Sequence, residues 1–203
     1  MGKHCEEEEC VGFSYDVFIS FRREDTGNSF IGHLRKELGR KGINSFVDES
    51  DVSTGEGPSH ALCEEAIEES RVFIVVFSEN YASSTWCLDE LVRIMERIDN
   101  MNTKQLFFPV FYHVNPSDIR HGKNSFREHM KTHEDKFGKE SQRIKAWSSA
   151  LSKAVNYSGK HITTTGYVLQ QFHSILFLFH PKFRKRKKKS TLIFYAFFIL
   201  RYF

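Results

Sequence analysis

Short apolar runs alternate with longer amphipathic segments between residues 15 and 155 of this chain. The apolar runs predict four strands, at residues 15–21, 43–47, 72–77 and 106–114. The amphipathic segments predict helices at residues 29–40, 61–70, 86–98 and 141–155, and short helical pieces within residues 117–135. Gly42 is predicted to end the first of these helices. The predicted core positions of the first and last helices are Phe30, Leu34, Leu38, Ile144, Trp147, Leu151, Ala154 and Val155. Strands that are apolar along their whole length and alternate with helices predict an α/β fold, an open parallel sheet with helices on both faces.

Ligands bind such sheets at the carboxyl ends of the strands, so the segments that follow the predicted strands are the candidate binding regions. These segments are residues 22–27, 48–59, 78–86 and 115–122. Pro109 lies inside the fourth predicted strand and has no backbone N–H to donate, which predicts a sheet edge or a bulge there.

The predicted helix at residues 86–98 has one apolar stripe, which should face the core. The stripe comprises Leu88, Leu91, Val92 and Met95. Trp86 and Glu90 are four residues apart, so they share a face, and a helical wheel places that face away from the stripe. Two interpretations of Trp86 and Glu90 stay open. They form half of a small-molecule pocket, or Trp86 is a surface tryptophan and Glu90 pairs with Arg93 or Arg97.

Composition narrows the function classes. The net charge is only +3, and residues 184–189, a run of arginine and lysine, supply much of the basic excess. We therefore expect no specific nucleic-acid partner. The four cysteines show neither CxxC spacing nor a paired histidine motif, so we expect no metal site and a reducing compartment. The amino terminus lacks the apolar segment of a secretory signal.

The pattern divides the chain into three parts. Residues 1–14 are polar and acidic and are predicted to be a flexible lead-in; residues 15–160 form the α/β domain. Residues 161–203 are rich in Phe and Lys, and we interpret them as an irregular tail, disordered or derived from a truncation. An amphipathic or polybasic membrane anchor is the alternative, but the apolar run at 192–203 is shorter than the roughly 20 residues of a spanning helix, so we expect no membrane partner.

Ordered motifs within residues 15–159 carry a family resemblance. They are residues 15–22 (YDVFISFR) with 24–26 (EDT), 30–34 (FIGHL), 46–48 (FVD), 66–71 (AIEESR), 81–91 (YASSTWCLDEL), 109–112 (PVFY) and 114–120 (VNPSDIR). In order and spacing they resemble the plant-type Toll/interleukin-receptor (TIR) domain of intracellular disease-resistance proteins. No nucleotide-binding P-loop and no leucine-rich repeat accompanies them, which predicts a TIR-only or truncated receptor.

The resemblance implies a flavodoxin-like fold and NAD+ cleavage, with NAD+ as substrate and no cofactor. By resemblance Glu90 is the catalytic glutamate and Trp86 the tryptophan beside it. Loss of nicotinamide develops positive charge on the ribose, which a carboxylate stabilises, and an aromatic face can stack on a base. Arg22, at the end of a strand, can hold a phosphate, and Ser84 lies near a helix start, where anions are favoured. The alternative for Arg22 is a surface arginine paired with Glu24 or Asp25.

The family uses Gly32 and His33 in a self-association surface, so other TIR domains are expected partners. Three departures from the family pattern favour a second function class, a non-catalytic adaptor or decoy that acts through TIR–TIR contacts. The segment after the first strand has Arg23 in place of a glycine and Gly27 in place of an arginine, residues 54–58 change the loop after the second strand, and the tail after residue 160 is abnormal for the family.

The resemblance also bears on Cys87, on an alternative function of the same fold and on the compartment. Cys87 matches a position used in a nucleic-acid-cleaving side activity of the family, but we interpret it as a buried structural thiol. A phosphoreceiver on the same fold is set aside, because the chain lacks an acidic cluster after the first strand. The expected compartment is the cytoplasm, with residues 184–189 as a candidate nuclear-localisation run.

Overall fold

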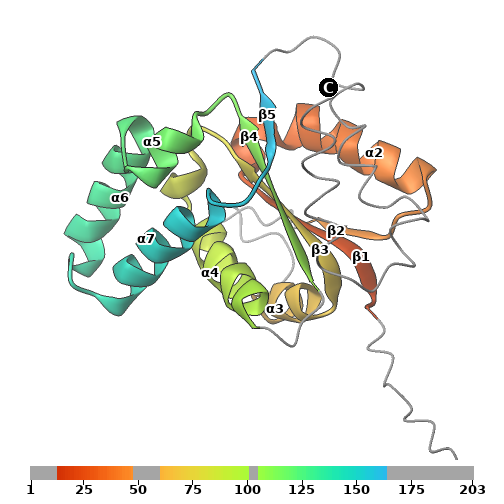
Figure 1. The fold of residues 1–203 in the computed structure, drawn as a ribbon, viewed down its shortest axis with the longest axis horizontal. Coiled ribbons are helices and arrows are strands. Elements are labelled where there is room, and N and C mark those ends of the chain that lie inside the picture. Colours follow the sequence, from red (N-terminus) through yellow and green to blue (C-terminus); the bar gives the residue numbers. More distant parts are fainter. Residues whose placement is uncertain (1–12, 48–59, 101–104, 164–203) are drawn as a thin grey trace, which may run out of the picture.

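The computed structural model describes residues 13–47, 60–100 and 105–163 of the chain. Its sheet contains five strands, all parallel, in the order β2-β1-β3-β4-β5 (Figure 1). Their bounds are β1 Tyr15–Phe21, β2 Ser45–Val47, β3 Ser70–Phe77, β4 Leu106–Tyr112 and β5 Lys160–Ile162. This order is that of flavodoxin-like sheets, in which the winding direction changes between β1 and β3.

Helical segments connect the strands. They are α1 Arg23–Thr26, the π-helical turn η1 Gly27–Ile31, α2 Gly32–Arg40, α3 His60–Glu68, the 3-10 turn η2 Tyr81–Ser83, α4 Thr85–Asp99, α5 Pro116–Arg120, α6 Asn124–Phe137 and α7 Gln142–Ala154. Helical turns therefore begin at Arg23, before the start predicted at residue 29, and most of the candidate binding region 22–27 is helical. Residues 117–135, predicted as short pieces, contain the 14-residue α6. None of the helices in the described part of the chain has the length and apolar character needed to cross a bilayer.

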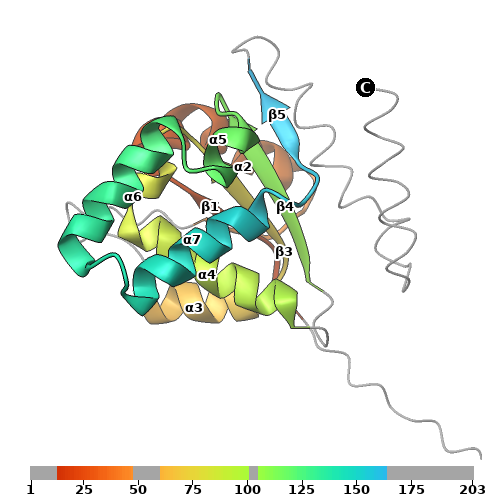
Figure 2. The same cartoon turned by 60° about the vertical axis from the view of Figure 1, so that its left-hand side comes forward.

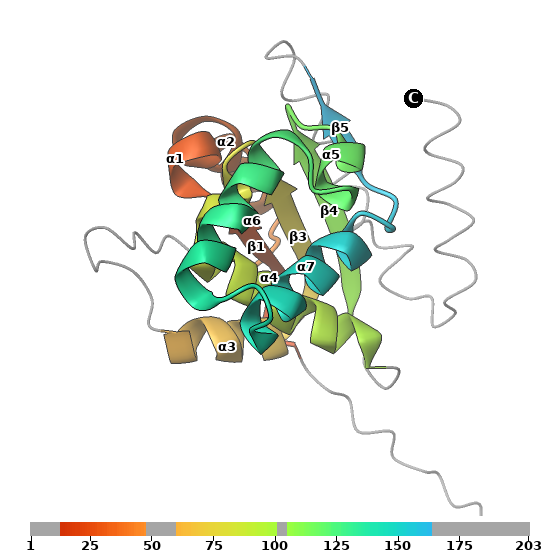
Figure 3. The ribbon, with the colours of Figure 1, turned by 90° about the vertical axis from the view of Figure 1, so that its left-hand side faces the viewer.

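The described helices cover both faces of the sheet, as predicted. In Figures 1 and 3, α2 lies on one side of the strands, and α3 and α4 lie on the other. Figure 2 shows α7 alongside α4, with α6 next to α7. The predicted core positions are confirmed on both sides, because the following side chains are all buried: Phe30, Leu34, Leu38, Ile144, Trp147, Leu151, Ala154 and Val155.

Helix α2 ends at a glycine, as the sequence predicts. Gly42 has a φ of 68°, a left-handed conformation that glycine adopts without strain. The N–H of Ile43 donates to the carbonyl of Leu38 at 3.0 Å, and that of Gly42 donates to Gly39 at 2.9 Å. These two bonds form a Schellman motif, which satisfies carbonyls at the helix end and turns the chain toward β2.

Strand β4 lies inside the sheet, which corrects the simple edge prediction made from Pro109. The strand pairs with β3 from Leu106 onward, but with β5 only from Val110 onward. Pro109 therefore lies one residue before the pairing of β4 with β5 begins. The fifth strand, which the sequence pattern did not predict, lies at the boundary that we placed at residue 160. The predicted tail beyond residue 163 lies outside the described residues.

Gly159 brings β5 to β4, and we expect Gly159→Ala to lower the free energy of unfolding by about 1–3 kcal/mol. A Cβ at this position would lie 2.2 Å from the carbonyl oxygen of Pro109, too close for the backbone to remain in place. Urea unfolding of the full chain measures the loss. The matched control is Gly39→Ala in α2, where a Cβ meets nothing within 4 Å, and which should be stabilising by about 0.5–1 kcal/mol. Equal stability of Gly159→Ala and the unmodified chain would contradict the close approach.

Candidate active site

The candidate site begins at the start of α4. Ser84 is the N-cap of this helix, with an extended φ of −88° and ψ of 115°, and its Oγ accepts a hydrogen bond from the N–H of Cys87 at 3.3 Å. Serine suits this position because its short side chain satisfies a backbone donor that the helix leaves without an intrahelical partner. The cap fixes where α4 starts and therefore the positions of Trp86 and Glu90 on the helix.

Glu90 is buried, with only 5% of its surface exposed, so the prediction that its face points away from the core is wrong. A helical wheel assumes one buried stripe, but α4 packs against α3, α7 and β1 on different sides. The Oγ of Ser20, in β1, donates to Oε2 of Glu90 at 2.6 Å. The carboxylate therefore lies beside the carboxyl end of β1, where this type of sheet binds ligands.

A chain of buried polar groups continues from Ser20. The Tyr81 hydroxyl donates to the carbonyl of Cys87 at 2.9 Å, and its oxygen lies 3.1 Å from the Ser20 Oγ. The Sγ of Cys87 donates to the carbonyl of Phe21 at 3.5 Å, and Cys87 is 5% exposed, so its prediction as a buried thiol is confirmed. Burial raises the pKa of the Tyr81 phenol well above its usual value, and the charges of Cys87 and Glu90 add to this. Tyr81 therefore stays protonated and can donate.

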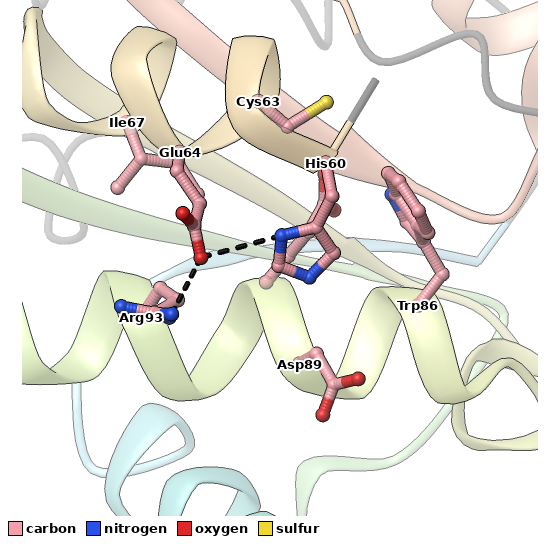
Figure 4. A pocket seen from close by; sticks show the side chains of 8 residues that line it. His60, Cys63, Glu64, Ile67, Trp86, Asp89 and Arg93 are labelled. Carbon is pink, nitrogen blue, oxygen red and sulfur yellow. Dashed lines mark hydrogen bonds and ion pairs between the residues drawn. The ribbon is translucent and has the colours of Figure 1, made fainter. Parts of the chain in front are cut away.

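Helices α3 and α4 enclose a small pocket that includes Glu90 (Figure 4). Trp86 projects from α4 and meets the His60 ring edge-to-face, with centroids 5.2 Å apart. His60 Nδ1 lies 3.3 Å from a carboxylate oxygen of Glu64, which also pairs with Arg93. The cavity has a volume of about 10 Å³, room for about one water molecule. Its wall consists of His60, Cys63, Glu64, Ile67, Trp86, Asp89, Glu90 and Arg93.

The contacts of Arg93 and Arg97 test the interpretation in which Glu90 pairs with one of these arginines on the surface. Arg93 pairs with Glu64 across the two helices, and the Nε of Arg97 donates to Oε1 of Gln105 at 3.3 Å. Glu90 turns to Ser20 instead. The arrangement therefore favours the pocket interpretation, in which Trp86 and Glu90 face the same cavity.

Arg22 lies in a separate polar cluster at the ends of β1 and β3. Its guanidinium pairs with Asp25 at 2.6 Å and with Glu24 at 3.5 Å, which is the alternative geometry foreseen for this arginine. Asp25 also accepts hydrogen bonds from the Ser78 hydroxyl at 2.6 Å and the Asn80 N–H at 3.1 Å. The cluster joins the start of α1 to the segment after β3.

Gly32 and His33 are exposed at the start of α2. Helix α2 and Glu90 belong to opposite faces of the sheet, because α2 packs with Val17 and Ile19 whereas α4 packs with Phe18. A surface formed around His33 would therefore lie on the side of the sheet away from the pocket. In the part of the chain that the structure describes, no three His, Cys, Asp or Glu side chains are grouped to hold a metal ion.

A protein-family model described as the TIR domain matches residues 14–190. This chain belongs to the TIR domain family. TMV resistance protein N of Nicotiana glutinosa is 47% identical to this TIR chain over 147 residues, 72% of the chain and 13% of the relative. Disease resistance protein RPV1 of Vitis rotundifolia is 44% identical over 162 residues, 80% of the chain and 11% of the relative. The TIR chain thus spans about an eighth or less of each of these two relatives.

A solved structure supports the same assignment. The TIR domains in the structure of the activated Roq1 resistosome, which directly recognises the pathogen effector XopQ, are 40% identical to this chain. The match covers 80% of this chain and 98% of the solved one, with a TM-score of 0.70. The flavodoxin-like fold expected from the family resemblance is thereby confirmed.

The structure of this TIR domain brings together some of the predicted site residues and adds others. Trp86 and Glu90 share the pocket, Ser84 caps their helix, and Arg22 is bound to Asp25. Sequence reasoning missed Ser20, Tyr81 and His60. Ser20 had a signal, since it is a hydroxyl residue among the otherwise apolar positions 17–21 of a parallel strand. His60 had none, because only the packing of α3 on α4 brings it to Trp86.

The Asp25 cluster should make the stability of this TIR domain depend on acidic pH. Burial raises the pKa of the Asp25 carboxyl, but hydrogen bonds from Ser78 and Asn80 and the charge of Arg22 outweigh it, so the pKa lies below its usual value of 3.8. A lowered folded-state pKa gives stability that is present above the unfolded-state value and is lost as pH falls through the folded-state value. We expect Asp25→Asn to lower the free energy of unfolding by about 1–3 kcal/mol at pH 7, with the difference shrinking below pH 3.8.

Urea unfolding of both proteins between pH 7 and pH 2.5 measures this difference. A deficit of Asp25→Asn that stays constant over the whole range would show that the carboxylate charge contributes nothing.

Proposed function

We propose that this TIR domain cleaves NAD+ to nicotinamide and ADP-ribose products, with Glu90 as the catalytic carboxylate. The observation that supports this most is the placement of Glu90: its carboxylate is buried at the carboxyl end of β1, fixed by Ser20 and beside the aromatic ring of Trp86. Parallel α/β sheets bind nucleotides at this edge. A buried carboxylate acts through a lower dielectric than one in water, so it stabilises a developing positive charge strongly.

The reaction breaks the bond between the ribose anomeric carbon and the nicotinamide nitrogen. Nicotinamide leaves with the bonding electron pair, the ribose becomes oxocarbenium-like, and water adds at the same carbon and releases a proton. Glu90 would stabilise the positive charge of the ribose, and the Trp86 ring would stack on a base. Ser84 and Arg22 would face the phosphates, which requires Arg22 to exchange Asp25 for the substrate.

Self-association fits this proposal as the activating step. A cavity of about 10 Å³ is too small for a dinucleotide, so His60 and Trp86 must move apart before the substrate can enter. We propose that copies associating through Gly32 and His33 on α2 favour that open arrangement. The relatives are named as plant disease-resistance proteins and one solved relative as a resistosome, which supports a role in plant immune signalling.

The test is NAD+ consumption by the full purified chain over a hundredfold range of protein concentration. We expect activity per molecule to rise with concentration and His33→Ala to weaken that rise. The control is His121→Ala, another exposed histidine, at the end of α5, which should behave like the unmodified chain. Activity per molecule that is independent of concentration would contradict activation by assembly.

The second candidate function is a non-catalytic adaptor or decoy that binds other TIR domains. The pairing of Arg22 with Asp25 and the small cavity favour it, because both leave the site closed to a phosphate-bearing ligand. A folded sample that binds a second TIR domain and consumes no NAD+ at any concentration would establish the adaptor and exclude the nucleosidase.

A further inference from the structure

Ser20 is the one hydroxyl residue among the buried positions of β1, and its exposed fraction is 0%. Its neighbours Ile19 and Phe21 face the opposite side of the sheet, and Ser20 shares the side of Phe18, toward α4. An apolar residue would suit this position by packing alone, since burying a hydroxyl is unfavourable unless it is hydrogen-bonded. A serine at this position therefore needs a hydrogen-bond partner, and Glu90 accepts its hydrogen bond.

Proton counting sets the direction of the hydrogen bonds around Ser20. A hydroxyl has one proton to donate, and the Tyr81 hydroxyl donates its own to the carbonyl of Cys87 at 2.9 Å. The Ser20 proton then lies between two acceptors, the Tyr81 oxygen at 3.1 Å and Oε2 of Glu90 at 2.6 Å. The shorter bond to the charged oxygen is the stronger one. Tyr81 thus leaves the Ser20 proton for Glu90.

We propose that Ser20 is a positioning residue for the catalytic step: its hydroxyl holds one oxygen of Glu90, orients the carboxylate and favours its ionised form. The inference rests on the proposed NAD+ cleavage for its effect on rate, but the contact between Ser20 and Glu90 has a test of its own. The donor belongs to β1, which at Ser20 still pairs with β3 opposite Val75, so the carboxylate is held by the sheet rather than by a loop.

The first measurement is steady-state NAD+ cleavage by the full-length Ser20→Ala chain. We expect kcat to fall roughly 10- to 100-fold, the range for losing a hydrogen bond to a charged group, with KM changing less than about twofold. Ser20→Thr keeps the hydroxyl on a residue suited to strands and should recover most of kcat. A KM rise with unchanged kcat, or equal loss in both variants when both are folded, would overturn the inference.

The matched control is Ser70→Ala. Ser70 is also 0% exposed, and its hydroxyl donates to the carbonyl of Ala66 at 2.6 Å, at the opposite end of the sheet. The Ser70→Ala substitution removes a buried serine hydrogen bond that is as long as the one between Ser20 and Glu90 but lies outside the site. We expect Ser70→Ala to lower the unfolding temperature about as much as Ser20→Ala while leaving kcat unchanged. A kcat loss as large as that of Ser20→Ala would mean that general destabilisation explains both.

The second measurement does not depend on catalysis. Carbon-13 NMR of the Glu90 carboxyl group follows its titration in the full chain, and we expect the midpoint in Ser20→Ala to lie about one pH unit above that of the unmodified chain, because the donor to the ionised form is gone. The other titratable or charged groups around Glu90 are the same in both proteins. Among the residues that the structure describes, they are His60, Cys63 and Glu64 from α3, Cys87, Asp89 and Arg93 from α4, and Tyr81 from η2.

These measurements separate the two proposals. An unmodified chain without NAD+ cleavage, together with a raised Glu90 midpoint in Ser20→Ala, would exclude the proposed function and retain the Ser20 control of Glu90. An active chain whose kcat and Glu90 midpoint are both unaffected by Ser20→Ala would retain the function and overturn the inference.

Discussion

Replacing Glu90 with glutamine is expected to lower the rate of NAD+ cleavage by roughly 10³-fold while the domain stays folded. Glutamine has nearly the shape of glutamate, and its carbonyl oxygen can still accept the hydrogen bond from Ser20. What is lost is the negative charge, which stabilises the ribose cation only while that cation forms. The loss should therefore fall on kcat rather than KM. Steady-state assays of the full chain at a protein concentration that supports assembly measure both constants.

The control for this prediction is Glu96→Gln on the same helix. Glu96 is exposed and lies outside the pocket wall, so the same loss of one negative charge from α4 should leave the rate unchanged. Equal activity of Glu90→Gln and Glu96→Gln would exclude Glu90 as the catalytic group. A Glu90→Gln chain that fails to unfold cooperatively would be replaced by Glu90→Asp, which keeps the charge but withdraws it from the ribose.

Replacing Trp147 with alanine is expected to lower the free energy of unfolding by about 3–5 kcal/mol. Trp147 is 0% exposed, and its Nε1 donates to Asp89 at 2.8 Å, which joins α7 to α4. The ring also contacts His133 edge-to-face at 5.1 Å, and the Arg143 guanidinium lies 4.8 Å from its centre. Alanine would leave a cavity between three helices and remove one of the two side chains that donate to Asp89, the other being Arg143.

Urea unfolding at pH 7 measures this loss, with Ser149→Ala in α7 as the control. Ser149 is exposed, so its replacement should change stability by less than about 0.5 kcal/mol. Trp147→Phe should fall between the two, because the ring volume is largely kept and the hydrogen bond to Asp89 is lost. A Trp147→Ala loss below about 1 kcal/mol would mean that α7 does not hold α4 in place.

The proposed assembly surface and the pocket lie on opposite faces of the sheet, which constrains the proposed mechanism. His33 lies on α2, on the opposite side of the sheet from α4, so association through α2 cannot add a side chain to the pocket on the same subunit's other face. Strand β1 connects the two layers, because its side chains pack with both, and it carries Ser20 and leads directly into Arg22. The Ser20 measurements therefore also examine the strand that connects the two layers.

The sequence by itself determined most of the elements and the family. The β1 strand was predicted with its observed bounds, the inward stripe of α7 was predicted residue by residue, and Gly42 ends α2 as expected. These features depend on interactions between residues close in sequence, such as helical periodicity and the left-handed conformation of glycine, so a one-dimensional pattern contains them. The motifs from residue 15 to residue 120 likewise sufficed to indicate the TIR family.

Only the tertiary structure decided where the carboxylate of Glu90 lies. A helical wheel placed it on the outer face, but α4 is enclosed by α3, α7 and β1, and Ser20 from 70 residues away turns it inward. The meeting of His60 with Trp86, and the close approach of Gly159 to Pro109, likewise join segments that are distant in the chain. Such contacts depend on how the elements pack in three dimensions. The periodicity of one helix or strand indicates which of its faces is apolar, but not which other elements pack against it.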